Sequence, residues 1–125
     1  MGTKIIGVIV LFLVVLNIHA QNITEVQSSK VNDMLKTDKG WVVLDVRTPQ
    51  EFSQGHLPGA LNIDIYQNNA LEKISKLNKD AKYIVYCRTR NRSGVVSDFM
   101  IQKGFKTVYQ MVDGIAGWNQ VKGKE

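Results

Sequence analysis

The sequence predicts a doubly wound α/β domain, in which a mostly parallel sheet of about five strands is flanked by helices on both faces. Two observations support this prediction. Along residues 21–125, short apolar runs suited to strands alternate with segments of helical period, a pattern typical of parallel sheets. The same residues contain no repeat, no low-complexity tract and no linker rich in proline or serine, so we expect a single domain.

The first twenty residues differ from the rest of the chain. Lys4 precedes the apolar run Ile5–Leu16, which only Gly7 interrupts, and the segment closes on Ala20. A basic start, an apolar stretch and a small final residue are typical of a secretory signal peptide. We therefore expect residues 1–20 to be removed on export. The alternative is a membrane anchor, although this apolar run is shorter than the ~20 residues that a spanning helix needs.

The first half of the domain alternates strands with helices. A short strand over residues 23–26 precedes a helix that Ser28 begins as a favoured N-cap and that Gly40 ends. The run 41–46 has the continuous apolar character of a buried strand. A threonine cap and a first-turn proline then predict a short helical turn, and residues 61–63 form the next strand.

The second half continues the alternation and contains the only cysteine. Apolar side chains three residues apart predict a helix over residues 69–77, and the strand 83–86 runs directly into Cys87. A helix follows from Gly94 to the residue before Gly104. Residues 108–111 form the last strand, and Gly114–Trp118 is a short closing helix with Trp118 in the core. On the helix after the cysteine, the residues that we expect to be buried are Val95, Val96, Phe99 and Met100.

Composition argues against several classes of function. Without Lys4 the chain has 15 basic and 11 acidic side chains, a net charge of 15 − 11, or +4. The lysines are spread along the chain without interleaved aromatic residues, so we do not expect nucleic-acid binding. The cysteine and histidine spacings form no metal-ligand set, and we expect no metal ion.

The surroundings of Cys87 predict a reactive thiolate. A single cysteine forms no disulfide within the chain, and this one lies at the carboxyl end of a strand, where ligands bind in open parallel sheets. The unpaired N–H groups that begin the next helix favour an anion. Arg88, Arg90 and Arg92 add positive charge, which favours the thiolate and predicts an oxyanion substrate. The alternative is a buried, inert cysteine.

Three segments of the sequence resemble the rhodanese family, and together they cover nearly all of residues 21–125. The run Asp45–Phe52, followed by Gly55–Ala60 and Asn62-Ile63, is similar to the first signature of rhodanese domains. Tyr86–Ser93 resembles their active-site loop, and Gly104–Trp118 resembles their C-terminal segment. The segments occur in the family's order and register.

This resemblance implies a sulfurtransferase without an organic cofactor or a metal. Cys87 attacks the outer sulfur of thiosulfate or a related donor, sulfite leaves, and a thiol or cyanide takes the sulfur from the resulting persulfide. Arg88 and Arg92 are expected to hold the sulfonate of the donor. The residues expected to bind the donor and the persulfide are Arg88, Thr89, Arg90, Asn91, Arg92 and Ser93. Those expected to act structurally near the site are Asp45, Arg47 and His56.

The resemblance also carries expectations about context. Arg90 stands where the family most often has glycine, so we expect it to narrow the conformations of the loop or to add a charge at its rim. A short leader before one sulfurtransferase domain favours a bacterial periplasmic location. We expect a monomer with no stable membrane association after the leader is removed.

Two other functions are compatible with parts of this pattern. Phosphatases and arsenate reductases of related fold also place a cysteine before an oxyanion-binding loop, but these phosphatases need an arginine six positions after the cysteine. Ser93 occupies that position here, and Arg92 comes one residue too early. A non-catalytic sulfur carrier or interaction module is the second alternative. Such interaction modules commonly lose the cysteine, which this chain keeps.

Overall fold

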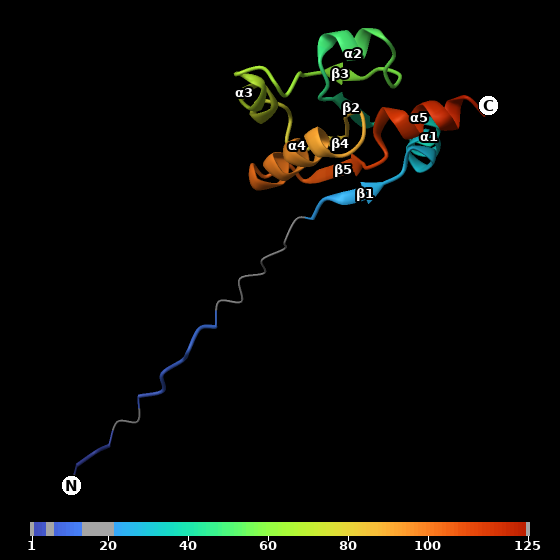
Figure 1. Cartoon of the computed structure of the whole chain (residues 1–125). Coiled ribbons are helices and arrows are strands. Elements are labelled where there is room, and N and C mark those ends of the chain that lie inside the picture. Colours follow the sequence, from blue (N-terminus) through green and yellow to red (C-terminus); the bar gives the residue numbers. More distant parts are fainter. Residues whose placement is uncertain (1, 5–6, 14–21, 125) are drawn as a thin grey trace.

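The strands of the domain form a parallel sheet whose order differs from their order in the chain. In the computed structural model, residues 2–4, 7–13 and 22–124 are described. Within residues 22–124, five strands have the order β1-β5-β4-β2-β3, and all their pairings are parallel. Their bounds are β1 Thr24–Val26, β2 Trp41–Asp45, β3 Leu61–Asn62, β4 Lys82–Tyr86 and β5 Thr107–Met111. The predicted doubly wound α/β class is confirmed (Figure 1).

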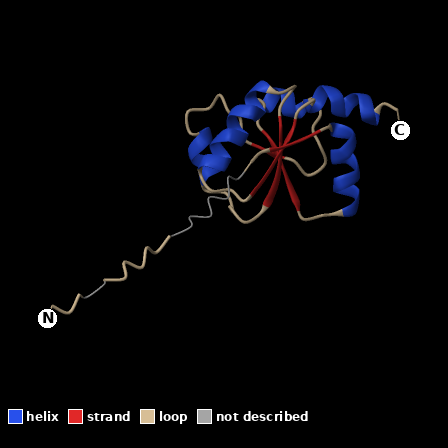
Figure 2. Ribbon diagram, turned by 90° about the horizontal axis from the view of Figure 1, so that it is seen from below, coloured by secondary structure: helices blue, strands red, loops and turns tan. Residues whose placement is uncertain are grey.

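Helices cover both faces of this sheet, so the strands lie between two layers of helices (Figure 2). One face packs against α1 (Ser28–Thr37) and α5 (Gly114–Lys122), and the other against α3 (Ala70–Ser75) and α4 (Asn91–Gln102). A short helix, α2 (Pro49–Ser53), follows β2. Side chains of β4 alternate between the two cores, because successive residues of a strand point to opposite faces. Tyr83, Val85 and Cys87 belong to the α3/α4 core, and Ile84 and Tyr86 belong to the α1/α5 core.

The topology places the end of β4 in a natural binding position. From β2 the chain passes through α2 to the outer strand β3, whereas from β4 it passes through α4 to β5 on the other side. Connections that leave adjacent strands in opposite directions open a crevice at the carboxyl ends of those strands. The loops after β2 and β4 therefore meet at one edge of the sheet.

The expected elements are present, but two details differ. Ser28 is the first residue of α1, whose N-cap is Gln27, and one residue of the predicted buried face of α4 is exposed. Val96 and Met100 are fully buried and Trp118 is 6% exposed, as the sequence predicts, but Val95 is 58% exposed. A helix turns by about 100° per residue, so when Val96 and Met100 face the sheet, Val95 points away from it.

Of the leader predicted over residues 1–20, residues 1, 5–6 and 14–20, including the predicted cleavage site, lie outside the described residues. Residues 7–13, which are described, form no helix or strand. In the described part of the chain, no helix has the length and apolar character needed to span a bilayer.

Candidate active site

Cys87 lies where β4 ends and the chain turns toward α4. Its side chain continues the alternation of Tyr83 and Val85 and therefore points to the α4 side of the sheet. The Ser93 N–H donates to Cys87 Sγ over 3.4 Å, and Ser93 Oγ lies 3.4 Å from the same sulfur. Cys87 is only 2% exposed. The sulfur thus lies at the start of α4, as predicted, but deeper than a freely accessible nucleophile.

The first turn of α5 holds two carbonyl groups of the cysteine loop. The Ile115 N–H donates to the Cys87 carbonyl oxygen at 2.9 Å, and the Ala116 N–H donates to that of Arg88 at 3.2 Å. Gly114 has a φ of +60°, in the region that favours glycine. A Cβ at this position would lie 2.3 Å from the Arg88 carbonyl oxygen. The approach of α5 to the loop therefore requires glycine at this position.

Arg88 is exposed and lines a cavity beside the loop. Among the described residues, its guanidinium forms no ion pair or side-chain hydrogen bond. The cavity has a volume of about 460 Å³, which is ample for a small anion. The residues that line it are Arg47, Glu51, Gln54, Gly55, Arg88, Ile115 and Asn119. An unpaired guanidinium at this cavity is available to an oxyanion.

Arg92 is already paired with a carboxylate. Its Nη1 lies 2.6 Å from Glu51 Oε1 and its Nη2 lies 2.9 Å from Glu51 Oε2, and its guanidinium is 5.5 Å from the centroid of the Tyr66 ring. Glu51 also forms the capping box of α2 with Thr48. The hydrogen bonds from Arg92 lower the pKa of Glu51 to about 2, so the pair is charged at neutral pH. In this structure Arg92 thus holds Glu51, whereas the sequence predicts that it holds a sulfonate.

Arg90 pairs with a glutamate of the edge strand β1. Its Nη2 lies 3.2 Å from Glu25 Oε2, and both side chains are more than half exposed. The backbone φ of Arg90 is −134°, so the loop needs no left-handed residue here. Arg90 is expected either to narrow the conformations of the loop or to add a charge at its rim. The exposed Arg90–Glu25 pair agrees with the second of these effects. Thr89 and Asn91 are also exposed, and Asn91 begins α4.

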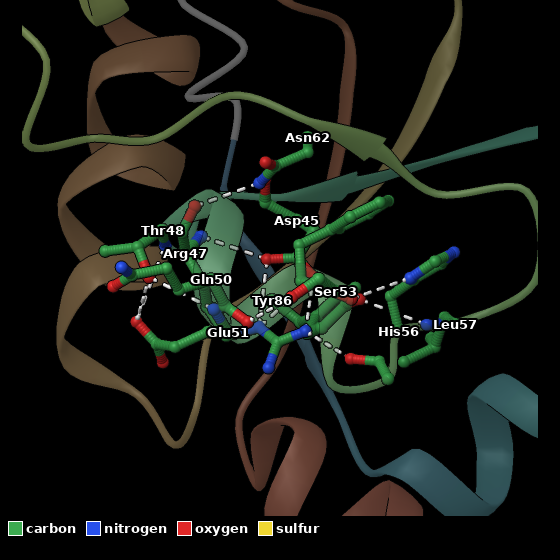
Figure 3. Close-up of polar contacts among 12 residues, drawn as sticks. Asp45, Arg47, Thr48, Gln50, Glu51, Ser53, His56, Leu57, Asn62 and Tyr86 are labelled. Atoms are coloured by element: carbon green, nitrogen blue, oxygen red, sulfur yellow. Dashed lines mark hydrogen bonds and ion pairs between the residues drawn. The ribbon is translucent and has the colours of Figure 1, made fainter.

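Asp45 and Arg47 form a buried ion pair beneath the site (Figure 3). Arg47 Nη2 lies 2.7 Å from Asp45 Oδ2 and also donates to the Gly55 carbonyl oxygen at 2.8 Å. The Tyr86 hydroxyl donates to Asp45 Oδ2 at 2.5 Å and accepts from the Leu57 N–H at 3.1 Å. Burial, reinforced by Asp45, raises the pKa of Tyr86 well above its usual range. The network ties β2 and β4 to the turn before β3.

His56 lies on the surface of the same turn. Its ring stacks on Phe52, with ring centroids 3.7 Å apart, and its Nδ1 is 2.9 Å from the Phe52 carbonyl oxygen. Figure 3 draws this histidine beside Leu57, which the network described above holds in place. These contacts fit the structural role expected of His56. Among the described residues, no cluster of three or more histidine, cysteine or acidic side chains is arranged to hold a metal ion.

Gln110 is a buried polar side chain at the loop that sequence reasoning missed. It lies on β5 and is 5% exposed. Its Nε2 donates to the Arg90 carbonyl oxygen at 2.9 Å and to Ser93 Oγ at 3.0 Å. The only signal in the sequence was a glutamine within an apolar strand. Such a residue needs buried hydrogen-bond partners, but nothing in the sequence says which ones.

Comparison with known proteins identifies the family. Residues 28–121 match the model of the rhodanese-like domain, and the chain belongs to this family. A sulfurtransferase of Allochromatium vinosum is 28% identical over 96 residues, which are 77% of this chain and 88% of that protein. The thiosulfate sulfurtransferase GlpE of Pseudomonas aeruginosa is 33% identical over 84 residues, 67% of this chain and 74% of GlpE.

A solved structure agrees with these relatives. The crystal structure of a rhodanese-related protein from Thermoplasma volcanium matches with a TM-score of 0.68 and 31% identity, over 78% of this chain and 92% of that one. Membership of the family and the named relatives support sulfur transfer as the general chemistry of this chain.

Proposed function

We propose that the chain moves sulfane sulfur from thiosulfate, or from a donor of similar size and charge, through a persulfide on Cys87. The observation that carries this proposal is a cysteine sulfur at the start of α4, held by the Ser93 N–H, in a loop whose Arg88 is unpaired among the described residues. The backbone donor stabilises negative charge on sulfur. The unpaired guanidinium supplies the attraction for an anionic donor.

The reaction has two steps. The Cys87 thiolate attacks the outer sulfur of thiosulfate, a sulfur–sulfur bond forms, and sulfite leaves with the electron pair of the bond that breaks. A thiolate or cyanide then attacks the outer sulfur of the persulfide, and Cys87 leaves as a thiolate. No net oxidation or reduction of the protein occurs over the cycle.

Arg88 is the residue proposed to hold the sulfonate. Its guanidinium is exposed at the cavity of about 460 Å³, whereas Arg90 and Arg92 are paired with Glu25 and Glu51. A planar guanidinium offers two parallel N–H donors to an oxoanion. Because Cys87 is 2% exposed, the donor must present a slim reacting atom, as the terminal sulfur of thiosulfate does.

Sulfite release and mass spectrometry test the proposal. The domain of residues 21–125 is incubated with thiosulfate, sulfite is quantified, and the intact mass is measured before and after addition of a thiol. We expect one sulfite per added sulfur atom, loss of that sulfur to the thiol, and neither event in Cys87→Ser. Hydrolysis of p-nitrophenyl phosphate without sulfite release would instead support the phosphatase alternative. A persulfide that forms but does not turn over with small thiols would instead support a non-catalytic sulfur carrier.

We also propose that residues 1–20 direct export to the periplasm, and that the domain over residues 21–125 acts there as a monomer. The support is the basic, apolar and small-residue pattern of the leader. Cell fractionation, N-terminal sequencing and the solution mass of the exported protein test this. We expect a periplasmic monomer that begins at Gln21. An intact N-terminus in the membrane fraction would contradict cleavage and support an anchor.

A further inference from the structure

The buried Gln110 side chain links β5 directly to Ser93 Oγ through a hydrogen bond. Its orientation follows from the chemistry of its partners. The Arg90 carbonyl oxygen accepts hydrogen bonds and donates none, so the amide atom 2.9 Å from it must be the nitrogen. The second hydrogen of this nitrogen is directed to Ser93 Oγ at 3.0 Å. Ser93 Oγ therefore accepts from Gln110.

This contact decides what the Ser93 hydroxyl proton does. The hydroxyl has two acceptors within reach, the Arg90 carbonyl oxygen at 3.0 Å and Cys87 Sγ at 3.4 Å. The Arg90 carbonyl oxygen already accepts from the Gly94 N–H at 2.9 Å and from Gln110 at 2.9 Å, which fills its two lone pairs. The Arg90 carbonyl oxygen therefore does not need a hydrogen bond from Ser93. The Ser93 hydroxyl can rotate and direct its proton to the Cys87 sulfur.

The direction of the bond between Ser93 and Cys87 depends on the charge of the sulfur. In the thiol form, the Cys87 S–H donates to Ser93 Oγ. When the thiol loses its proton to solvent, the Ser93 hydroxyl rotates and donates to the thiolate, which then receives both the O–H and the N–H of Ser93. In both forms Gln110 occupies one of the two lone pairs of Oγ, so one lone pair and the hydroxyl proton remain for contacts with Cys87 Sγ and the Arg90 carbonyl oxygen.

We propose that Gln110 is a positioning residue that keeps Ser93 as a hydrogen-bond donor to the ionised Cys87 sulfur. The consequence for sulfur transfer rests on the function proposed above, but the effect on the ionisation of the thiol does not. A donor that is fixed before the reaction stabilises developing negative charge without reorganisation. Gln110 thus stabilises the Cys87 thiolate in both steps of the proposed reaction, when it attacks the donor and when it leaves the persulfide.

The charged groups around this cluster stay constant when Gln110 is changed. Arg92, whose charge acts on Cys87, remains paired with Glu51. The other charged side chains of the surrounding elements include Arg88 and Arg90 of the loop, Glu25 of β1, Asp45 of β2, Arg47 after β2, Lys82 of β4, Asp98 of α4, Asp113 before α5 and Lys122 of α5. Gln110→Met has nearly the same length, removes the two donors and adds no charge. Differences between this variant and the wild type therefore report on the hydrogen bonds.

Thiolate absorbance in the ultraviolet provides the test. Cys87 is the only cysteine, so the pH midpoint of this absorbance, after subtraction of a Cys87→Ser blank, reports on that sulfur without requiring a reagent to reach it. We expect Gln110→Met to raise the midpoint by about one unit, which corresponds to about 1.4 kcal/mol. Gln110→Glu, whose carboxylate attracts the Ser93 proton and repels the thiolate, should raise it further.

A double-mutant cycle separates positioning from a general structural effect. In a Ser93→Ala background, Gln110→Met should leave the midpoint unchanged, because Gln110 acts through the Ser93 hydroxyl. Ser97→Ala is the matched control, since Ser97 Oγ is buried on α4 and has no hydrogen-bond partner among the described residues; its midpoint should equal that of the wild type. Each variant is first shown to be folded by circular dichroism.

Two results would overturn the inference. One is an unchanged midpoint in both Gln110 variants, and the other is an equal shift in the Ser93→Ala background. If Gln110→Met fails to fold, Gln110→Leu, which likewise removes the amide without adding charge, and its Ser93→Ala partner make the same comparison. Sulfite release by the wild type is measured in parallel. Its absence would refute sulfur transfer from thiosulfate while leaving the comparison of midpoints valid.

Discussion

Replacing Gly114 by alanine should dislodge the loop that carries Cys87. The backbone at Gly114 has a φ of +60°, and an added Cβ would lie 2.3 Å from the Arg88 carbonyl oxygen and 2.7 Å from that of Cys87. Both atoms belong to the main chain, so no side-chain rotation relieves the contact. Either the loop or the first turn of α5 must move.

The expected cost follows from these contacts. Alanine in the left-handed region costs about 1 kcal/mol or more. Restoring ordinary contact at about 3.4 Å requires a displacement of roughly 1 Å, which disrupts the bonds from Ile115 and Ala116 to the loop carbonyls. Each of these bonds contributes about 1 kcal/mol. The total is about 3 kcal/mol, a large part of the stability of a domain this size, and equivalent to a fall in Tm of more than about 10 °C.

Urea denaturation of the domain tests this value, with Gly59→Ala as the control. Gly59 has a similar φ of +69°, but an added Cβ there meets nothing within 4 Å. We expect Gly59→Ala to lose only the backbone cost of about 1 kcal/mol, so the difference between the variants measures the contact with the loop. Equal losses in the two variants would refute the argument. Gly114→Ala should also slow sulfite release, because Cys87 and Arg88 shift with their carbonyls.

Three further predictions concern charged residues. Arg88→Ala should raise the KM for thiosulfate at least several-fold without changing the urea midpoint, since the exposed guanidinium pairs with no described residue; an unchanged KM would argue against it as the donor site. Asp45→Asn should lower the free energy of unfolding by about 3 kcal/mol, because it leaves Arg47 buried without its counter-ion, and a loss below about 1 kcal/mol would contradict this. Glu51→Gln should cost about 1 kcal/mol at neutral pH. The folded-state pKa of Glu51 lies at about 2, below the ordinary 4.5, so its contribution is present above pH 4.5 and disappears as the pH falls to 2. Denaturation of both proteins across this range should show the difference shrinking, and a constant difference would exclude Glu51 as its source.

The position of Cys87 was predictable because it follows from local pattern. An apolar run that ends in cysteine and passes into a helix of apolar period fixes strand, loop and helix in sequence. The parallel arrangement then follows from the alternation of elements. The same reasoning misplaced Val95, because periodicity alone does not fix the rotation of a helix to within one residue.

The partners of the loop arginines were not predictable in this way. Their cationic character predicts an anion nearby, and from the sequence the substrate and the Cys87 sulfur are the expected anions. In the folded chain, Glu25 and Glu51 supply anions for Arg90 and Arg92 from segments 65 and 41 residues away. The contacts of Gln110 are likewise long-range. Such pairings depend on which strands become neighbours, which residue type and local spacing do not encode.

The depth of Cys87 bears on how the protein withstands other thiols. At 2% exposure, its sulfur is sheltered from bulky disulfides such as oxidised glutathione. In the proposed reaction, a persulfide would lengthen the Cys87 side chain by one atom, so the transferred sulfur would lie beyond the buried sulfur that anchors it. If the proposed export and sulfur transfer hold, such shielding would protect Cys87 from oxidation by large disulfides while a small thiol could still reach the outer sulfur of the persulfide.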